Sequence, residues 1–137
     1  MKIIRKEIVI NAPVAKVWLH ITDPEKIASW LMPNDFAATA GREFYLECQH
    51  QGRIACVVNE IIPPEKLVYS FQSAATKVAT LVTITLAPEA DGTRLTLIHS
   101  GWDALPPEEQ GLADGFNSGW GTLLEKLQEQ LRGHANV

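Results

Sequence analysis

Apolar and polar residues alternate with a period of two along much of this chain, which is typical of strands that bury one face. The first such segment covers about residues 3 to 11, where Ile4, Lys6, Ile8 and Ile10 share one face. The same alternation recurs between Phe36 and Ser100. It predicts that these side chains point inward: Phe44, Leu46, Tyr69, Phe71, Val82, Ile84, Leu97 and His99.

Short turn signals divide this region into separate strands. They are Ala40-Gly41, Gln51-Gly52, Pro63-Pro64 and Asp91-Gly92. Proline lacks the N–H that a ladder hydrogen bond needs, so a strand of about residues 54 to 62 ends at the proline pair. Because tight turns join consecutive strands, we expect an antiparallel sheet of about six or seven strands.

Helical spacing of apolar residues occurs on both sides of this region. Two short helices are predicted after the first strand, one opened by Pro13 and one by Asp23-Pro24. The last segment carries a stripe at spacings of three and four, made of Phe116, Trp120, Leu123, Leu124, Leu127 and Leu131. It predicts a C-terminal helix of about five or more turns. The fold class is therefore α+β, with the helices on one side of the sheet.

Composition and charge narrow the class of protein. The 137 residues fit a single domain, and 46% apolar with 20% charged residues is ordinary for a globular protein. The net charge is -4 and the basic residues are scattered, which argues against nucleic acid as a partner. The N-terminus lacks a secretory signal and the apolar run from Val78 to Pro88 is too short for a membrane span, so we expect a cytoplasmic protein.

Two cysteines, Cys48 and Cys56, are expected to be reduced, buried and structural in that compartment. A zinc site formed with His50 lacks a fourth ligand, so we predict no bound metal. The chain also has no phosphate loop, dinucleotide fingerprint or serine elbow, and we predict no cofactor.

Several short stretches, in this order and spacing, carry a resemblance to a known family. They are Ala12-Pro13 with Val17-Trp18, Asp23-Pro24-Glu25 with Trp30, Gly52 before Glu60-Ile61, Pro63-Pro64-Glu65-Lys66-Leu67, Gly92-Thr93-Arg94-Leu95, His99-Ser100-Gly101-Trp102, and Gly119-Trp120 before a leucine helix. The chain resembles the START-like helix-grip superfamily, also called SRPBCC. Within it, the chain resembles the family of activators of heat-shock-protein-90 ATPase.

The resemblance implies a curved sheet gripping the C-terminal helix, with a cavity between them that holds apolar molecules in related families. The eukaryotic chaperone activator is similar to this chain only over its C-terminal domain, so the family name is a poor guide to function. Ala40-Gly41 replaces two glycines that the family often carries, a departure that affects only local hairpin geometry.

Large side chains near turns and glycines are the candidates to line such a cavity. They are Trp30, Met32, Phe44, Tyr69, Phe71, His99, Trp102, Phe116 and Trp120. Gly119 and Gly121 would leave room beside Trp120. The alternative is that these aromatic residues simply fill the core. For His99 we favour a core histidine satisfied by a neighbour over a catalytic base, because no inward carboxylate is evident to orient it.

Three functions remain open on this basis. The first is binding or carriage of a small hydrophobic ligand, lipid-like or aromatic. The second is an enzyme of the cyclase or hydrolase kind, with His99 or Tyr69 as acid-base groups. The third is a chaperone or stress-response accessory that acts by protein interaction, which an exposed apolar patch would favour. We predict the first, with no catalytic residues and a chaperone as a further partner.

Overall fold

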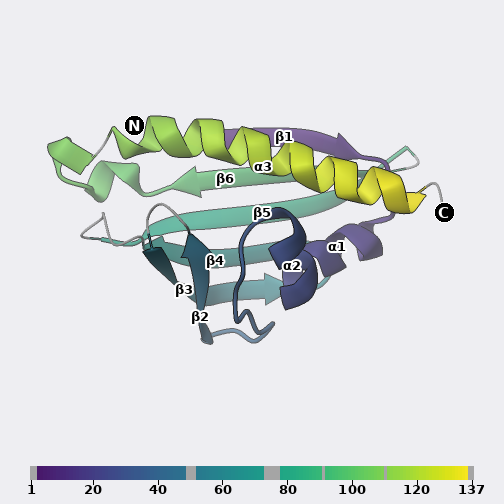
Figure 1. The fold of residues 1–137 in the computed structure, drawn as a ribbon, viewed down its shortest axis with the longest axis horizontal. Coiled ribbons are helices and arrows are strands. Elements are labelled where there is room, and N and C mark those ends of the chain that lie inside the picture. The colour runs from purple at the N-terminus through teal and green to yellow at the C-terminus, as the bar shows by residue number, and fades with distance from the viewer. Residues whose placement is uncertain (1–2, 49–51, 73–77, 91, 110, 136–137) are drawn as a thin grey trace.

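A computed structural model of the chain describes residues 3–48, 52–72, 78–90, 92–109 and 111–135. The elements follow in this order: β1 (Ile4–Ile10), α1 (Val14–Thr22), α2 (Pro24–Trp30), β2 (Glu43–Cys48), β3 (Gly52–Ile62), β4 (Lys66–Gln72), β5 (Thr80–Glu89), β6 (Gly92–Ser100), the short 3-10 helices η1 (Trp102–Ala104) and η2 (Pro107–Glu109), and α3 (Leu112–Ala135). Figure 1 shows this arrangement, with α3 running along the sheet.

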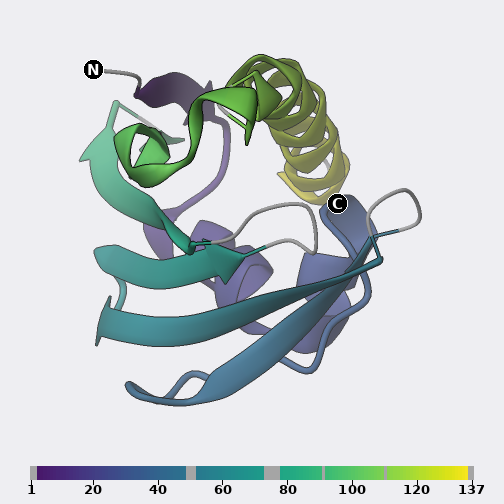
Figure 2. The same cartoon turned by 90° about the vertical axis from the view of Figure 1, so that its left-hand side faces the viewer.

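The strands form one antiparallel sheet in the order β1-β6-β5-β4-β3-β2. From β2 to β6, consecutive strands pair as hairpins, and β1 forms the other edge by pairing with β6. Helices α1 and α2 therefore occupy the connection that carries the chain from one edge of the sheet to the other. The sheet is strongly curved when it is seen from its end (Figure 2).

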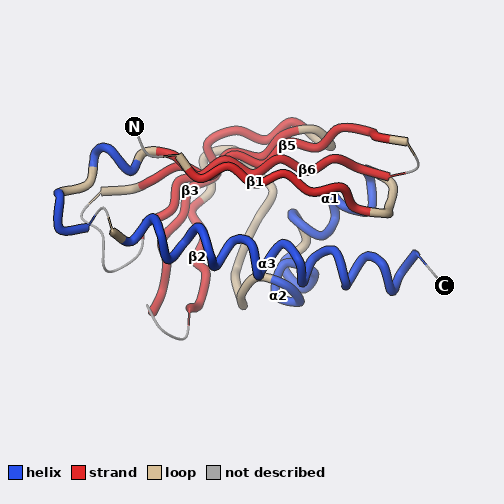
Figure 3. The backbone as a smooth tube through the Cα atoms, turned by 90° about the horizontal axis from the view of Figure 1, so that it is seen from above, coloured by secondary structure: helices blue, strands red, loops and turns tan. Residues whose placement is uncertain are grey.

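All three α-helices lie on the same side of the sheet, as the view from above shows (Figure 3). The buried stripe of α3 contains Trp120, Leu124, Leu127 and Leu131, the residues expected from the helical spacing. Burial of these side chains against the inward strand residues removes apolar surface from water and holds the helix on the sheet. The prediction of an α+β helix-grip fold is confirmed, with six strands in the described part of the chain.

Element ends differ from the sequence prediction in small ways. Strand β3 begins at Gly52 rather than near residue 54, because its ladder with β2 extends as far as the Cys48–Gly52 pair. Asp23 does occupy the N-cap position of α2, but its side chain makes no capping hydrogen bond. The expected turn residues Gln51 and Asp91 lie outside the described residues.

One glycine has a clear steric role at the start of β6. A Cβ atom on Gly92 would lie 2.3 Å from the backbone oxygen of Ile10, so no larger residue fits beside β1 at this point.

Within the described residues, no helix is both long and apolar enough to cross a membrane.

Candidate functional site

An apolar groove of about 340 Å³ opens between the first half of α3, strand β4 and the segment that follows α2. Its lining residues are Leu31, Met32, Phe71, Gly111, Gly115, Phe116, Gly119, Trp120 and Leu123. None of these carries a charged side chain. The groove therefore offers apolar surface and aromatic rings, but no group that could neutralise an ionised ligand.

Three glycines leave one side of this groove open. Gly111, Gly115 and Gly119 follow one another at a spacing of four, and a Cβ atom added to any of them would meet no described atom within 4 Å beyond its chain neighbours and the backbone of its own helix. A glycine inside a helix costs about 1 kcal/mol relative to alanine, so Gly115 and Gly119 weaken α3 without any steric need for them in the free protein. Gly121 differs from expectation: its α-carbon faces Lys6 on β1, with the ammonium nitrogen 3.8 Å from an added Cβ.

The closed side of the groove is a cluster of aromatic rings. Phe71 on β4 meets Phe116 edge to face at a centroid distance of 5.5 Å, and Trp120 lies 6.4 Å from the same phenylalanine. Such T-shaped contacts are favourable for aromatic pairs and hold the rings in defined orientations. A flat apolar ligand would meet a preformed wall on this side.

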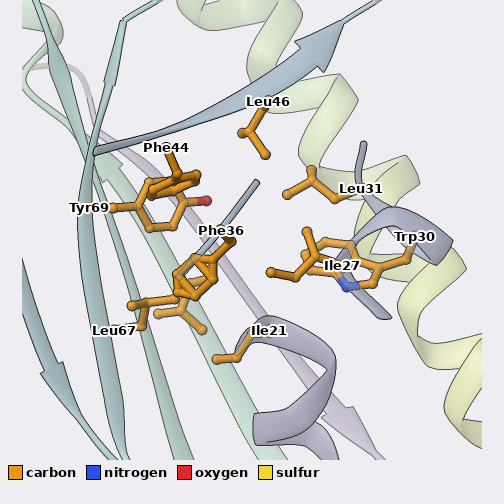
Figure 4. A pocket seen from close by; sticks show the side chains of 10 residues that line it. Ile21, Ile27, Trp30, Leu31, Phe36, Phe44, Leu46, Leu67 and Tyr69 are labelled. Atoms are coloured by element: carbon orange, nitrogen blue, oxygen red, sulfur yellow. The ribbon is translucent and has the colours of Figure 1, made fainter. Parts of the chain in front are cut away.

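A second, much smaller cavity of about 20 Å³ lies deeper, between α1, α2 and the inner face of the sheet (Figure 4). It is lined by Ile21, Ile27, Trp30, Leu31, Phe36, Phe44, Leu46, Leu67, Tyr69 and Ile84. Leu31 belongs to the lining of both spaces and stands between them. About 20 Å³ is room for roughly one water-sized group.

Tyr69 supplies the one hydroxyl group of this inner cavity. Its side chain extends from β4, and the hydroxyl oxygen points into the cavity toward Leu31 (Figure 4). The residue is 4% exposed and its ring packs against Phe44 at 5.5 Å between centroids. No hydrogen-bond partner for its hydroxyl is found in the part of the chain that the structure describes. Burial raises the pKa of the phenol above its usual value, with Cys56 adding to the effect, so Tyr69 is neutral.

Trp30 cannot serve as that partner, because its indole Nε1 already donates to the backbone oxygen of His20 at 2.7 Å. A buried hydroxyl without a partner costs about 1 to 3 kcal/mol of stability. Within the described residues, the hydroxyl of Tyr69 is therefore a buried polar group without a hydrogen-bond partner.

His99 lies in the same cross-strand row as Tyr69, with Val82 of β5 paired to both. It is fully buried but, unlike the hydroxyl of Tyr69, each of its ring nitrogens has a hydrogen-bond partner. Nδ1 accepts a hydrogen bond from Trp120 Nε1 at 3.0 Å, which places the ring proton on Nε2. That Nε2–H then donates to Thr80 Oγ1 at 2.6 Å, and the threonine hydroxyl donates to the Phe71 carbonyl at 2.9 Å. Burial lowers the pKa of His99 to about 4, so the imidazole is neutral.

Trp102 completes this polar cluster from the loop after β6. Its indole Nε1 donates to the backbone oxygen of His99 at 3.1 Å, and the two rings lie 4.5 Å apart. Phe116 packs against both rings, at 5.7 Å from His99 and 5.5 Å from Trp102, and covers them on the groove side. His99 and Trp102 therefore support the groove wall from behind without lining it.

The nine residues predicted from the sequence fall into three sets. Met32, Phe71, Phe116 and Trp120 line the groove. Trp30, Phe44 and Tyr69 line the inner cavity. His99 and Trp102 line neither space. The sequence reasoning treated all nine as one pocket because strand alternation gives the face of a residue but not its neighbours on that face.

Sequence reasoning missed Leu31, Gly111, Gly115 and Leu123 as lining residues. The signal for three of them was present, since Gly111, Gly115, Gly119 and Leu123 follow at intervals of four and so share one helix face. Leu31 follows α2 as its C-cap residue, at the boundary of the two spaces.

The cysteines do not face each other across the β2–β3 hairpin. Cys48 pairs with Gly52 in the ladder and Cys56 pairs with Phe44. Cys56 is a buried free thiol whose pKa is raised to about 12 by burial and, secondarily, by the charge of Asp35. His50, considered above as a zinc ligand, lies outside the described residues. Among the residues that are described, no group of three or more potential ligands gathers.

Together, the curved sheet, the gripping helix and the apolar groove define a protein of the helix-grip fold. The profile of the family called activator of Hsp90 ATPase homolog 1-like protein matches residues 11–132. This chain belongs to that family. No protein of curated function matches it in sequence.

Solved structures with the same fold agree with this assignment. Protein MLL2253 from Mesorhizobium loti is 31% identical, with a TM-score of 0.87 over 99% of this chain and 100% of that one. Protein BH1534 from Bacillus halodurans is also 31% identical, with a TM-score of 0.80 over 96% of this chain and 97% of that one. The Aha1 dimer from Colwellia psychrerythraea is 18% identical, with a TM-score of 0.81 over 96% of each chain, and shows similarity of fold alone.

Proposed function

We propose that this protein binds a small, uncharged hydrophobic molecule in the groove beside α3. The observation that carries the proposal is the pair of helix glycines, Gly115 and Gly119. Both lie within α3, where each costs about 1 kcal/mol relative to alanine, and neither has a neighbour within 4 Å that would exclude a larger side chain. Space for a ligand explains why these positions lack side chains.

The size and chemistry of the groove support the same function. A volume of about 340 Å³ lies within the range of small-molecule sites, which is about 300 to 1,000 Å³. Phe71, Phe116 and Trp120 present aromatic surface held by mutual packing, so little ordering is needed when a ligand binds. Association would be driven chiefly by removal of apolar surface from water.

The test is a titration with N-phenylnaphthylamine, a neutral probe whose fluorescence rises in apolar surroundings. We expect about one equivalent to bind the wild-type protein. Gly115→Leu should fill the groove and weaken binding at least tenfold, while α3 gains stability from the loss of a glycine. Ser118→Leu is the matched control, because it adds the same side chain to the exposed side of the helix, outside the groove lining. Unsaturable binding by the wild type, or equal binding by Gly115→Leu, would refute the proposal.

The other two functions receive less support from the site. The residues that line the groove offer no acid or base, since Phe116 separates His99 from it and the imidazole is fully engaged. Interaction with a chaperone stays a prediction that rests on the family's name and on the fold shared with the Aha1 dimer.

A further inference from the structure

We propose that the inner cavity receives the polar end of the groove's ligand, where the hydroxyl of Tyr69 donates a hydrogen bond to a carbonyl oxygen. This inference rests on the proposed function and adds the class of ligand, an uncharged carbonyl compound with an apolar body. Two independent observations lead to it. One is the small cavity that adjoins the groove, and the other is the unpartnered hydroxyl directed into that cavity.

The hydroxyl of Tyr69 is buried in apolar surroundings, with the residue 4% exposed. The other residues that line the cavity offer it no free hydrogen-bonding side chain within the described parts of the protein, since Trp30 already donates to His20. Buried polar groups in native proteins nearly always have a partner, so each exception calls for an explanation. A ligand that brings its own acceptor is such an explanation.

The cavity has the size of one such acceptor. Its volume of about 20 Å³ is room for roughly one water-sized group, which matches a single carbonyl oxygen rather than a ring or an acyl chain. A water molecule is held poorly there, because buried waters need about two to four polar partners and this cavity supplies one hydroxyl. A ketone oxygen needs only one donor, which Tyr69 provides.

Leu31 is the side chain between the groove and this cavity, since it lines both. It follows directly after α2 and is only half-buried. A change of its side-chain rotamer would connect the two spaces without breaking a hydrogen bond, because leucine has no polar side-chain atom. The apolar body of the ligand would then lie in the groove with its oxygen toward Tyr69.

The absence of charge from both linings decides the class of ligand. No lysine, arginine, histidine, aspartate or glutamate is among the residues that line either space. A carboxylate or an ammonium group would lose its hydration there without gaining an ionic partner, which is unfavourable. The oxygen of an uncharged carbonyl group needs only one hydrogen-bond donor, and the hydroxyl of Tyr69 provides it.

The experiment compares two neutral probes of similar shape, acetylnaphthalene and ethylnaphthalene, through quenching of tryptophan fluorescence. We expect the wild-type protein to bind the ketone about fivefold more tightly than the hydrocarbon, the usual effect of one net hydrogen bond. In Tyr69→Phe this preference should vanish, while the affinity for ethylnaphthalene stays the same. Tyr45→Phe is the matched control, because Tyr45 is the other tyrosine of the chain and lies on the outer face of β2. It should keep the preference.

An infrared measurement gives a second readout. The C=O stretch of bound acetylnaphthalene should move to lower frequency in the wild type and in Tyr45→Phe, but not in Tyr69→Phe. A ketone preference that persists in Tyr69→Phe, or equal binding of both probes by the wild type, would overturn the role of Tyr69 and leave the groove's function intact. Failure of the wild type to bind either probe would overturn both proposals.

Discussion

The neutral, buried state of His99 makes the protein sensitive to acid in a defined pH window. The unfolded chain exposes this imidazole with its ordinary pKa of 6.5, whereas burial lowers the value to about 4 in the folded protein. Between these two values the unfolded state binds more protons than the folded state, so the free energy of unfolding falls as the pH falls. The contribution of His99 is complete above pH 6.5 and is lost on the way down to pH 4.

The two pKa values set the size of the effect. Relative to pH 7.5, His99 should lower the free energy of unfolding by about 1 kcal/mol at pH 5.5 and by about 2 to 3 kcal/mol at pH 4.5. Urea unfolding followed by far-ultraviolet circular dichroism at pH 7.5, 6.5, 5.5 and 4.5 measures this directly. Carboxylates titrate over part of the same range, so the comparison needs a variant without the imidazole.

His99→Gln serves this purpose because its amide can accept from Trp120 and donate to Thr80, as His99 does, but does not titrate. We expect the stability difference between wild type and variant to change by about 2 to 3 kcal/mol from pH 7.5 to pH 4.5, to the disadvantage of the wild type at the lower pH. A difference that is constant across this range would show that the folded protein accommodates a charged His99, and the account of the buried network would be wrong.

Two substitutions test the structure around this network at neutral pH. Thr80→Val should lower the free energy of unfolding by about 2 to 3 kcal/mol, because it removes two hydrogen bonds and leaves the Nε2–H of His99 without an acceptor. Thr83→Val, on the outer face of the same strand, should change it by less than about 0.5 kcal/mol in the same urea assay. Gly101→Ala should cost about 1 to 2 kcal/mol, measured by thermal unfolding, because Gly101 has a φ of +94° that side chains disfavour and an added Cβ would approach Thr80 Cα at 3.4 Å. Unchanged midpoints for Thr80→Val or Gly101→Ala would contradict these assignments.

The architecture could be predicted from the sequence because its signals are periodic. In a strand, side chains alternate strictly between faces, so a run such as Leu67, Tyr69 and Phe71 already shows which residues point inward. The helical stripe from Phe116 to Leu131 is similarly unambiguous. The ends of elements were less certain, since the start of β3 at Gly52 depends on how far its ladder with β2 continues rather than on any local residue.

The arrangement of the site could be predicted only in part. Periodicity placed the aromatic residues on the inner face, but it could not show that Leu31 divides the enclosed space into a groove and a smaller cavity. Nor could it show that Gly121 faces Lys6 while Gly119 faces the groove. Both outcomes depend on the rotation of α3 and the path of the chain after α2, which are set by contacts between segments distant in sequence.

His99 and Tyr69 show that only tertiary packing decides whether the polar tip of an inward-facing residue finds a hydrogen-bond partner. Both are inward-facing residues with a polar tip, and Val82 pairs with both across the sheet. From the sequence both were candidates to contact a ligand, although a core histidine satisfied by a neighbour was favoured for His99. In the folded chain, Trp120 and Thr80 occupy both ring nitrogens of His99, which makes it a structural support for the groove wall. The side chains that line the cavity with Tyr69 offer no free hydrogen-bonding group in the described part of the chain, so its hydroxyl retains the capacity to bind an acceptor from a ligand.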